Sequence, residues 1–266
     1  MTPKVRSLFL FLIISLLYPA FAAAQSQGFP GREVYRSVPV WETEQLNQSF
    51  DKVIIIDVRS NYEFDTLHIK GAINIPLSNR TFPEDVAAIN DPLKSIVFYC
   101  NGHTCYKSYK AQIRAAKAGI TNTFSYDAGV FDWVSVYPER ATLLGKSPVE
   151  KSKLISKDRL AEHSLDPKQF SAKITDSTVI LDIREASQRG LMELFPYRQE
   201  NIEMDDKEAM NKFLDKIKKS GQPLLVYDES GKQVRWLQYH LDEKGIKNYN
   251  FMKGGVKQYF KSLRGG

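Results

Sequence analysis

The feature that most constrains this 266-residue chain is a pattern that occurs twice, at a spacing of 125 to 128 residues. The apolar run 53–59 ends in an Asp-x-Arg sequence, and the run 178–184 ends in the same way. A repeat of this length indicates a duplicated domain, because solenoid units are only about 20–50 residues long. We therefore expect two related domains, which the length of the chain permits.

In each half, short apolar segments alternate with amphipathic ones. Segments 96–99 and 224–227 are continuous apolar runs, typical of strands covered on both faces. The first is followed by a helix-like stretch over residues 109–118 with a glycine stop, and each half closes with a glycine turn before an aromatic helix. The pattern predicts an α/β fold in which each domain has a mainly parallel central sheet with helices on both faces.

The N-terminal residues 1–24 have the organisation of a secretory signal peptide. Lys4 and Arg6 precede an apolar run over 8–18, and small residues in an A-x-A pattern follow. The run is shorter than the roughly 20 residues that a membrane-spanning helix needs. We expect a periplasmic or secreted protein with no stable membrane span after signal cleavage, with domains over 33–143 and 150–266 and a linker over 137–151.

Composition is ordinary for a globular protein, with 42% apolar and 26% charged residues. The formal net charge of +6 falls to +4 without the two basic residues of the signal segment. Basic residues are scattered apart from a small cluster at Lys216, Lys218 and Lys219. Because nucleic-acid-binding proteins concentrate basic residues on one face, we expect no nucleic-acid partner.

The chain has only two cysteines, Cys100 and Cys105. Cys100 ends an apolar run, and a short glycine-containing loop and a helix-like stretch follow it. Backbone N–H groups of such a loop and the helix dipole favour an anion, and a thiol pKa there falls from about 8.5 to roughly 3.5–7.5. This context favours a nucleophilic Cys100 over a structural one. Two cysteines are too few for structural zinc, so we predict no metal site.

Three ordered segments resemble the motifs of rhodanese domains. They are Asp57-Val58-Arg59 with the following 68–76, the loop that begins at Cys100, and the closing segment 129–133. The resemblance covers about residues 34–138, and a weaker match with the same skeleton covers 153–263. The whole chain is similar to a tandem rhodanese. In the second copy Asp228 occupies the place of Cys100, so we expect that domain to be catalytically inactive.

The resemblance implies sulfurtransferase chemistry without a bound cofactor. Cys100 would take a sulfane sulfur from a small anion such as thiosulfate, hold it as a persulfide, and pass it to cyanide or a thiol, including a periplasmic protein thiol. Asp57 and Arg59 would support the loop from below. The substrate-binding loop would consist of Asn101, Gly102, His103, Thr104, Cys105 and Lys107.

The loop departs from the family pattern, which places an Arg-Ser pair five and six residues after the cysteine. Here Cys105 is in the fifth position, and Lys107-Ser108 come seventh and eighth. We expect a wider cup and an exposed His103 in the loop. Lys107 either supplies the missing positive charge or points outward into solvent. Two alternatives stay open: a thiol–disulfide or persulfide relay in which Cys105 is the resolving thiol, and a non-catalytic binding module.

Overall fold

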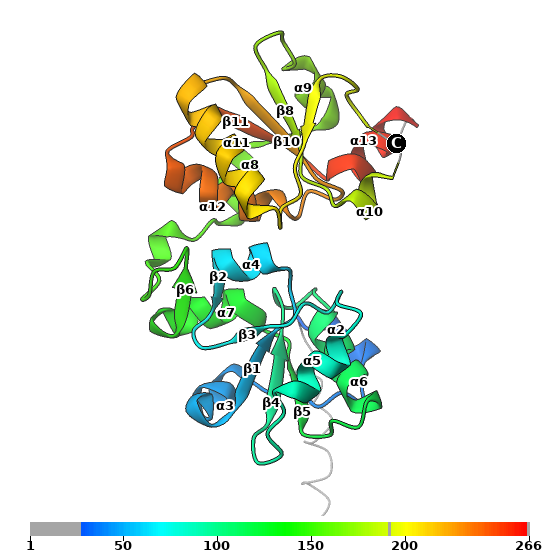
Figure 1. Ribbon diagram of the computed structural model, residues 1–266, viewed down its shortest axis with the longest axis vertical. Coiled ribbons are helices and arrows are strands. Elements are labelled where there is room, and N and C mark those ends of the chain that lie inside the picture. The colour runs from blue at the N-terminus through cyan, green and yellow to red at the C-terminus, as the bar shows by residue number, and fades with distance from the viewer. Residues whose placement is uncertain (1–27, 191–192, 265–266) are drawn as a thin grey trace, which may run out of the picture. The chain divides into compact units, whose positions relative to one another are not determined.

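The structure is a computed structural model that describes residues 28–190 and 193–264. The predicted signal peptide lies outside the described residues. Within them the chain divides into two compact units, the first comprising 28–60 and 67–142 and the second 61–66 and 143–264. Each unit contains a parallel β-sheet with helices packed against it, which confirms the predicted α/β class (Figure 1).

The first unit is built around a four-stranded parallel sheet with the strand order β3-β1-β4-β5. Ile54 pairs with Ile96, and Ile96 pairs with Thr123, so β1, β4 and β5 begin level with one another. The carboxyl ends of these strands therefore meet at one edge. The strands are β1 (Ile54–Asp57), β3 (Ile73–Asn74), β4 (Ile96–Tyr99) and β5 (Thr123–Tyr126), and β2 (Leu67–Ile69) pairs separately with β6 (Ala141–Leu143).

Helices cover both faces of this sheet. On one face, Phe82 of α5 and Ala111 of α6 pack with Phe98 in a buried cluster. Alternate residues of a strand point to opposite faces of the sheet. Tyr126 lies on the face opposite this cluster, where the centroid of its ring is 6.0 Å from that of buried Trp133 on α7. The helices are α2 (Pro30–Val34), α3 (Thr43–Gln48), α5 (Phe82–Ala88), α6 (Lys107–Lys117) and α7 (Gly129–Val136), with 3₁₀ turns η1 (Phe50–Lys52) and η2 (Pro138–Arg140).

The second unit has a five-stranded parallel sheet of order β7-β11-β10-β8-β9. Four of these five strands, β9-β8-β10-β11, correspond in order to β3-β1-β4-β5 of the first unit. The strands are β7 (Ser164–Leu165), β8 (Val179–Asp182), β9 (Gln199–Asn201), β10 (Leu224–Tyr227) and β11 (Tyr249–Met252). The helices are α4 (Asn61–Thr66), α8 (Lys157–Glu162), α9 (Pro167–Ala172), α10 (Ala186–Arg189), α11 (Lys207–Ser220), α12 (Val234–Lys244) and α13 (Gly255–Leu263), with η3 (Lys151–Lys153).

Three predicted segments differ in detail from the structure. The helix expected over 109–118 is α6, which begins two residues earlier at Lys107. Its N-cap residue Tyr106 makes no side-chain capping bond, so the sequence carries no capping signal there. The strand expected over 53–59 is limited to Ile54–Asp57. The segment predicted as a linker, 137–151, contains η2 and β6 rather than only irregular chain.

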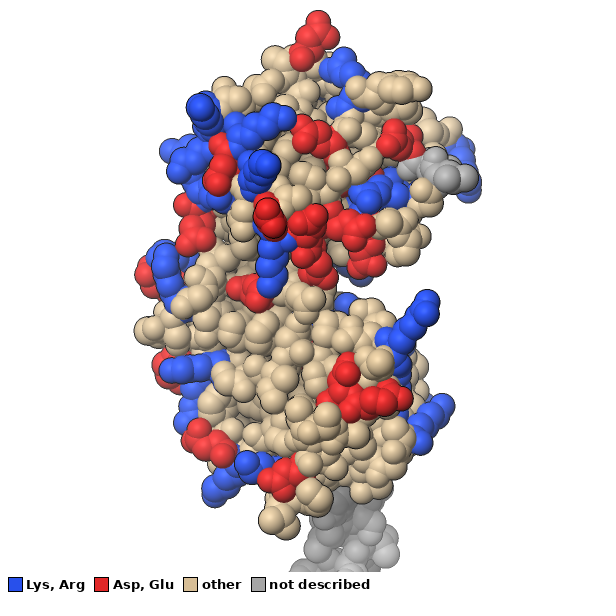
Figure 2. All heavy atoms as spheres, viewed as in Figure 1, with Lys and Arg blue, Asp and Glu red and all other residues tan. Residues whose placement is uncertain are grey.

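Charged side chains of both signs are interspersed on the face shown in Figure 2, and no continuous basic stripe is visible there. Over residues 28–190 and 193–264, no helix combines the length and apolar character needed to cross a bilayer.

Candidate active site

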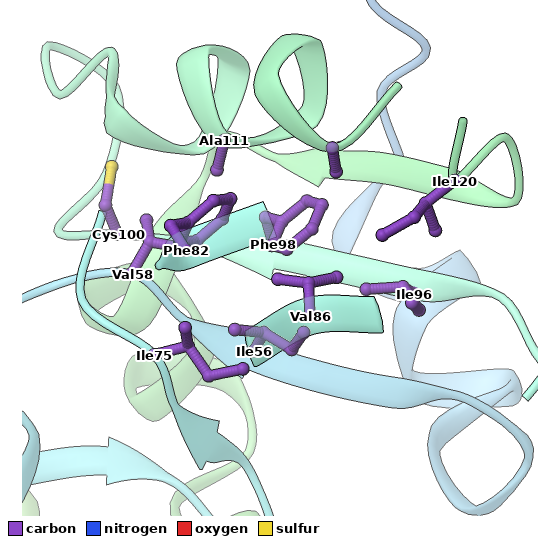
Figure 3. Close-up of a cluster of buried hydrophobic side chains, with 11 residues drawn as sticks. Ile56, Val58, Ile75, Phe82, Val86, Ile96, Phe98, Cys100, Ala111 and Ile120 are labelled. Atoms are coloured by element: carbon purple, nitrogen blue, oxygen red, sulfur yellow. The ribbon is translucent and has the colours of Figure 1, made fainter. Parts of the chain in front are cut away.

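Cys100 directly follows β4, at the edge of the sheet where parallel strands place their sites. The residue is fully buried. Figure 3 shows its side chain at one end of the apolar cluster that contains Phe82 and Phe98, with Ile96 and Ile120 at the other end. The apolar run of β4 thus carries the thiol from the core to the loop between β4 and α6.

A glycine at the start of α7 holds this loop against the sheet. The N–H of Val130 donates to the carbonyl of Cys100 at 3.0 Å. Gly129 has a φ of 70°, and a Cβ there would come within 2.6 Å of the Cys100 carbonyl oxygen. Only glycine allows so close an approach in this conformation. The predicted glycine turn before an aromatic helix is therefore also the contact that positions the cysteine loop.

The structure brings the two cysteines together. The Cys100 Sγ donates a hydrogen bond to the carbonyl of Cys105 at 3.2 Å and lies 3.9 Å from the Ser108 hydroxyl. The Cys105 thiol interacts with that of Cys100, and backbone N–H groups of Lys107 and Asn101 favour its thiolate. Both thiols are free rather than joined in a disulfide.

Of the two thiols, Cys105 has the lower pKa. The interaction with the Cys100 thiol lowers it to about 6, burial opposes this, and the backbone N–H groups of Lys107 and Asn101 and the charge of Lys107 assist it. Burial raises the pKa of Cys100 well above its ordinary value, and the bond and charge of Cys105 raise it further. The backbone N–H groups of Ser108 and Gly102 act in the opposite direction.

The expectation that the loop lowers the pKa of Cys100 itself was therefore wrong for this state of the protein. The backbone N–H groups of Gly102 and Ser108 favour an anion on Cys100, but its burial and the neighbouring Cys105 side chain outweigh them. Such a pair of thiols loses its protons in two coupled steps. A proton transfer from Cys100 to Cys105 is enough to form the Cys100 thiolate.

Arg59 connects the loop to β1. Its guanidinium makes paired hydrogen bonds to Asp57, with Nε–Oδ1 at 2.9 Å and Nη2–Oδ2 at 2.5 Å, and both side chains are fully buried. The same group donates to the Leu67 carbonyl at 2.5 Å and to the Asn101 side-chain oxygen at 3.2 Å. Of the two predicted supporting residues, Arg59 touches the loop directly and Asp57 holds Arg59.

His103 has its two ring nitrogens engaged. Nδ1 lies 3.1 Å from the Gly28 carbonyl, and Nε2 lies 2.8 Å from the carboxylate of Asp132 on α7. Its ring stacks on Phe29 with a centroid distance of 4.1 Å. The prediction of an exposed loop residue is correct in part, since the side chain is 39% exposed. The contacts with Gly28 and Phe29 join the loop to residues 28–35, which we call the N-terminal strap.

The remaining loop residues have distinct positions. Gly102 has a φ of 141° and accepts the N–H of Cys105 at 2.7 Å, which closes the turn. Thr104 is exposed, and Lys107 is the exposed first residue of α6.

Sequence reasoning did not assign site roles to Ser108, Asp132 or the strap. Ser108 directly follows Lys107, and Asp132 lies inside the closing segment 129–133, so both were within motifs already recognised. Their contacts depend on the loop conformation, which no sequence pattern specified.

The second unit has a carboxylate at the position of Cys100. The buried Asp228 directly follows β10 and accepts backbone N–H groups of Ser230 at 2.8 Å, Gln233 at 2.5 Å and Val234 at 3.2 Å, together with that of Gly231. Burial raises the pKa of Asp228, and these N–H groups oppose the rise. Such a set of converging amides is an anion cradle, and here a covalently attached anion fills it.

Residues 42–136 match the sequence model of the family described as Rhodanese-like domain. The match spans Asp57, Arg59, the Cys100 loop and the closing segment. This part of the chain is a rhodanese-like domain. No group of three or more His, Cys, Asp or Glu ligands gathers within the described ranges.

Curated relatives of the rhodanese-like domain include proteins named tRNA uridine(34) hydroxylase. That of Yersinia enterocolitica is 28% identical over 133 residues, which are 45% of this chain and 37% of the relative. That of Photorhabdus laumondii is 28% identical over 99 residues, 35% of this chain and 27% of the relative. The chain thus matches only about a third of the length of these relatives.

Solved structures with similarity to the chain include two sulfurtransferases. The thiosulfate sulfurtransferase of Pseudomonas aeruginosa has a TM-score of 0.40 and 18% identity, covering 85% of this chain and 43% of that chain. A human single-domain sulfurtransferase has a TM-score of 0.32 and 22% identity, covering 37% of this chain and 96% of that chain.

Proposed function

We propose that this protein is a sulfurtransferase that carries a sulfane sulfur on Cys100. The observation that supports this most is the position of Cys100 after β4, with the N–H groups of Gly102 and Ser108 directed at its sulfur. Those donors suit a thiolate or a terminal persulfide sulfur, both of which are anions.

The transfer takes place in two displacements. The Cys100 thiolate attacks the outer sulfur of a donor such as thiosulfate, the S–S bond of the donor breaks, and sulfite leaves with its electron pair. The Cys100 persulfide then gives its outer sulfur to cyanide or a thiolate, and the Cys100 thiolate is restored. A covalent intermediate of this kind divides one difficult step into two easier ones.

Cys105 prepares the nucleophile in this proposal. Its thiolate accepts the proton of Cys100, because the two side chains interact directly and the proton can pass from one sulfur to the other. Lys107 lies beside Cys105 and contributes positive charge. A lysine ammonium attracts an oxyanion as a point charge, without the two-pronged fit of arginine.

The second unit is, in this proposal, an inactive rhodanese-like domain, so that the chain is a tandem rhodanese. Its strand order β9-β8-β10-β11 supports this. A backbone hydrogen bond also supports it: the N–H of Val256 donates to the backbone carbonyl of Asp228 at 2.9 Å, as the N–H of Val130 donates to the carbonyl of Cys100. A carboxylate in the cradle cannot accept a sulfane sulfur. We further propose that the N-terminal segment directs the protein to the periplasm or outside the cell.

The test is thiocyanate production from thiosulfate and cyanide by the reduced protein. We expect Cys100→Ser to lose at least about 10³-fold in kcat/KM, as removal of a catalytic nucleophile does. Cys105→Ser should keep activity at alkaline pH. Equal rates for wild type and Cys100→Ser would reject the proposal and favour a binding module.

A specific contact favours a second candidate, a redox relay. Because Cys100 and Cys105 are hydrogen-bonded, the Cys105 thiolate is placed to attack the inner sulfur of a Cys100 persulfide. That step would form a Cys100–Cys105 disulfide and release hydrogen sulfide as HS⁻. Rapid disulfide formation and sulfide release after thiosulfate addition, without thiocyanate, would support the relay.

The names of the curated relatives suggest no further activity for this chain. Hydroxylation of tRNA uridine belongs to proteins of which about two thirds have no match here. The cysteine loop of the rhodanese-like domain supports sulfur transfer on its own.

A further inference from the structure

A pocket of about 450 Å³ opens in the second unit between α10 and α13. Figure 1 shows these two helices next to each other in this unit. The charged residues that line it are Arg184, Arg189, Glu229, Lys257, Lys261 and Arg264. We call it the α10–α13 pocket. Five cations and one carboxylate give it a strongly positive lining.

The pocket lies just outside the filled anion cradle. Glu229 directly follows Asp228, and Arg184 follows β8 at the same edge of the sheet. Arg184 is buried, pairs with Asp182 at 2.7 Å and lies 3.8 Å from Glu229. Since Asp228 occupies the backbone amides beneath, a ligand here would be recognised by side chains instead.

One donor beside the pocket has no partner among the described residues. Nη2 of Arg189 approaches Glu203 at 3.4 Å, but the buried Nη1 of Arg189 makes no hydrogen bond to any described residue. Within the same described part, Lys257, Lys261 and Arg264 form no ion pair.

Two apolar residues complete the wall of the pocket. Val256 is buried, and Phe260 packs against the apolar core of this unit. The volume is within the range of about 300–1,000 Å³ that small-molecule sites occupy. It exceeds what a bare tetrahedral oxyanion fills.

We propose that the α10–α13 pocket binds a small organic oxyanion, such as a sulfonate, carboxylate or phosphate attached to an apolar group. The oxyanion pairs with the guanidinium of Arg189 and with the lysines of α13, because guanidinium forks match planar pairs of oxyanion oxygens. The apolar part lies against Val256 and Phe260. This site does not depend on sulfur transfer at Cys100.

The test uses the full chain carrying Cys100→Ser, so that its outcome is independent of the proposed sulfurtransferase activity. Benzenesulfonate, neutral benzenesulfonamide and sulfate are titrated by calorimetry at low ionic strength. We expect benzenesulfonate to bind, sulfate to bind more weakly and the sulfonamide not to bind. Equal binding of sulfate and benzenesulfonate would overturn the role of the apolar wall.

Variants then locate the site. Arg189→Gln should weaken benzenesulfonate binding about tenfold, which is the size of one lost charge-assisted hydrogen bond. The double variant Lys257→Gln/Lys261→Gln changes exposed residues only, so we expect it to fold like the parent chain. It should weaken benzenesulfonate binding to a similar extent. Lys212→Gln on α11 is the matched loss of an exposed charge outside the pocket and should leave affinity unchanged. Equal effects of all three, or no binding by the parent chain, would overturn the proposal.

Discussion

At the residue scale, the proposed chemistry depends on two side chains five residues apart. Cys100 is buried after β4, its thiol donates to the backbone carbonyl of Cys105, and the Cys105 side chain raises the pKa of Cys100. Arg59 acts one layer below, where its guanidinium connects Asp57 of β1 with Asn101 of the loop. Reactivity at Cys100 thus depends on one neighbour that shares its proton and another that fixes its loop.

The thiol pair predicts a specific pH dependence. Sulfur transfer needs one deprotonated thiol, and the pKa of Cys105 is about 6, so activity should fall as the pH drops below about 6. In Cys105→Ser the low-pKa thiol is lost, while burial still raises the pKa of Cys100. The acidic limb of kcat/KM should therefore move to higher pH. An unchanged limb would mean that Cys100 itself is the low-pKa thiol.

The buried ion pair predicts a large loss of stability on truncation. Arg59→Leu leaves the buried Asp57 carboxylate without its partner, which should lower the free energy of unfolding by about 3–5 kcal/mol in urea titrations. As a control, Arg198→Leu removes an exposed partner of Asp176 and should change it little. Similar losses in both variants would show that the Asp57–Arg59 pair does not hold the loop.

At the scale of elements, the β4–α6 loop is held from two sides. The first turn of α7 approaches it so closely that Gly129 has no room for a side chain. The N-terminal strap contacts it through Phe29 and His103, and Arg32 of the strap pairs with buried Asp127 at 2.8 Å. Both contacts come from segments distant in sequence.

The close approach of α7 can be tested with two alanine substitutions. Gly119 has a φ of 88° and open space around it, so Gly119→Ala should destabilise by about 1 kcal/mol from backbone strain alone. Gly129→Ala adds a clash with the Cys100 carbonyl and should destabilise clearly more, with loss of activity. Equal losses in thermal unfolding would contradict the close packing of α7 on the loop.

The strap makes a separate prediction. Phe29→Ala removes the stacking partner of His103, so the amide hydrogens of residues 31–35 should exchange faster with deuterium, by about fivefold to tenfold. Val34→Ala changes a side chain that is 63% exposed and serves as the control. Unchanged exchange in Phe29→Ala would show that the strap is held by the Arg32–Asp127 pair alone.

At the scale of the whole molecule, each unit repeats one arrangement, and the two differ in the group that fills the loop after the central strand. A thiol pair occupies the first loop, and Asp228 occupies the second with four backbone hydrogen bonds. The strand order, the glycine turn and the buried Asp–Arg pair are common to both units. The two units therefore share a strand order and a buried Asp–Arg pair and differ in the side chain that follows the central strand.

The sequence predicted this framework well because apolar runs and glycines determine it. The run 96–99 specified a buried strand that ends at Cys100, and Asp57-x-Arg59 specified the pair below the loop. The sequence could not place the proton of the thiol pair, since this depends on the loop bringing Cys100 onto the carbonyl and thiol of Cys105. The contact of His103 with Asp132 likewise joins residues 29 positions apart and has no local signal.

The most direct test of the central claim is to map the sulfur. The reduced protein is treated with thiosulfate, its free thiols and persulfides are alkylated, and the peptides are identified by mass spectrometry. The account predicts the mass of one added sulfur atom on Cys100, absent in Cys100→Ser and removed by cyanide with release of thiocyanate. An added sulfur on Cys105, or none on either cysteine, would contradict it.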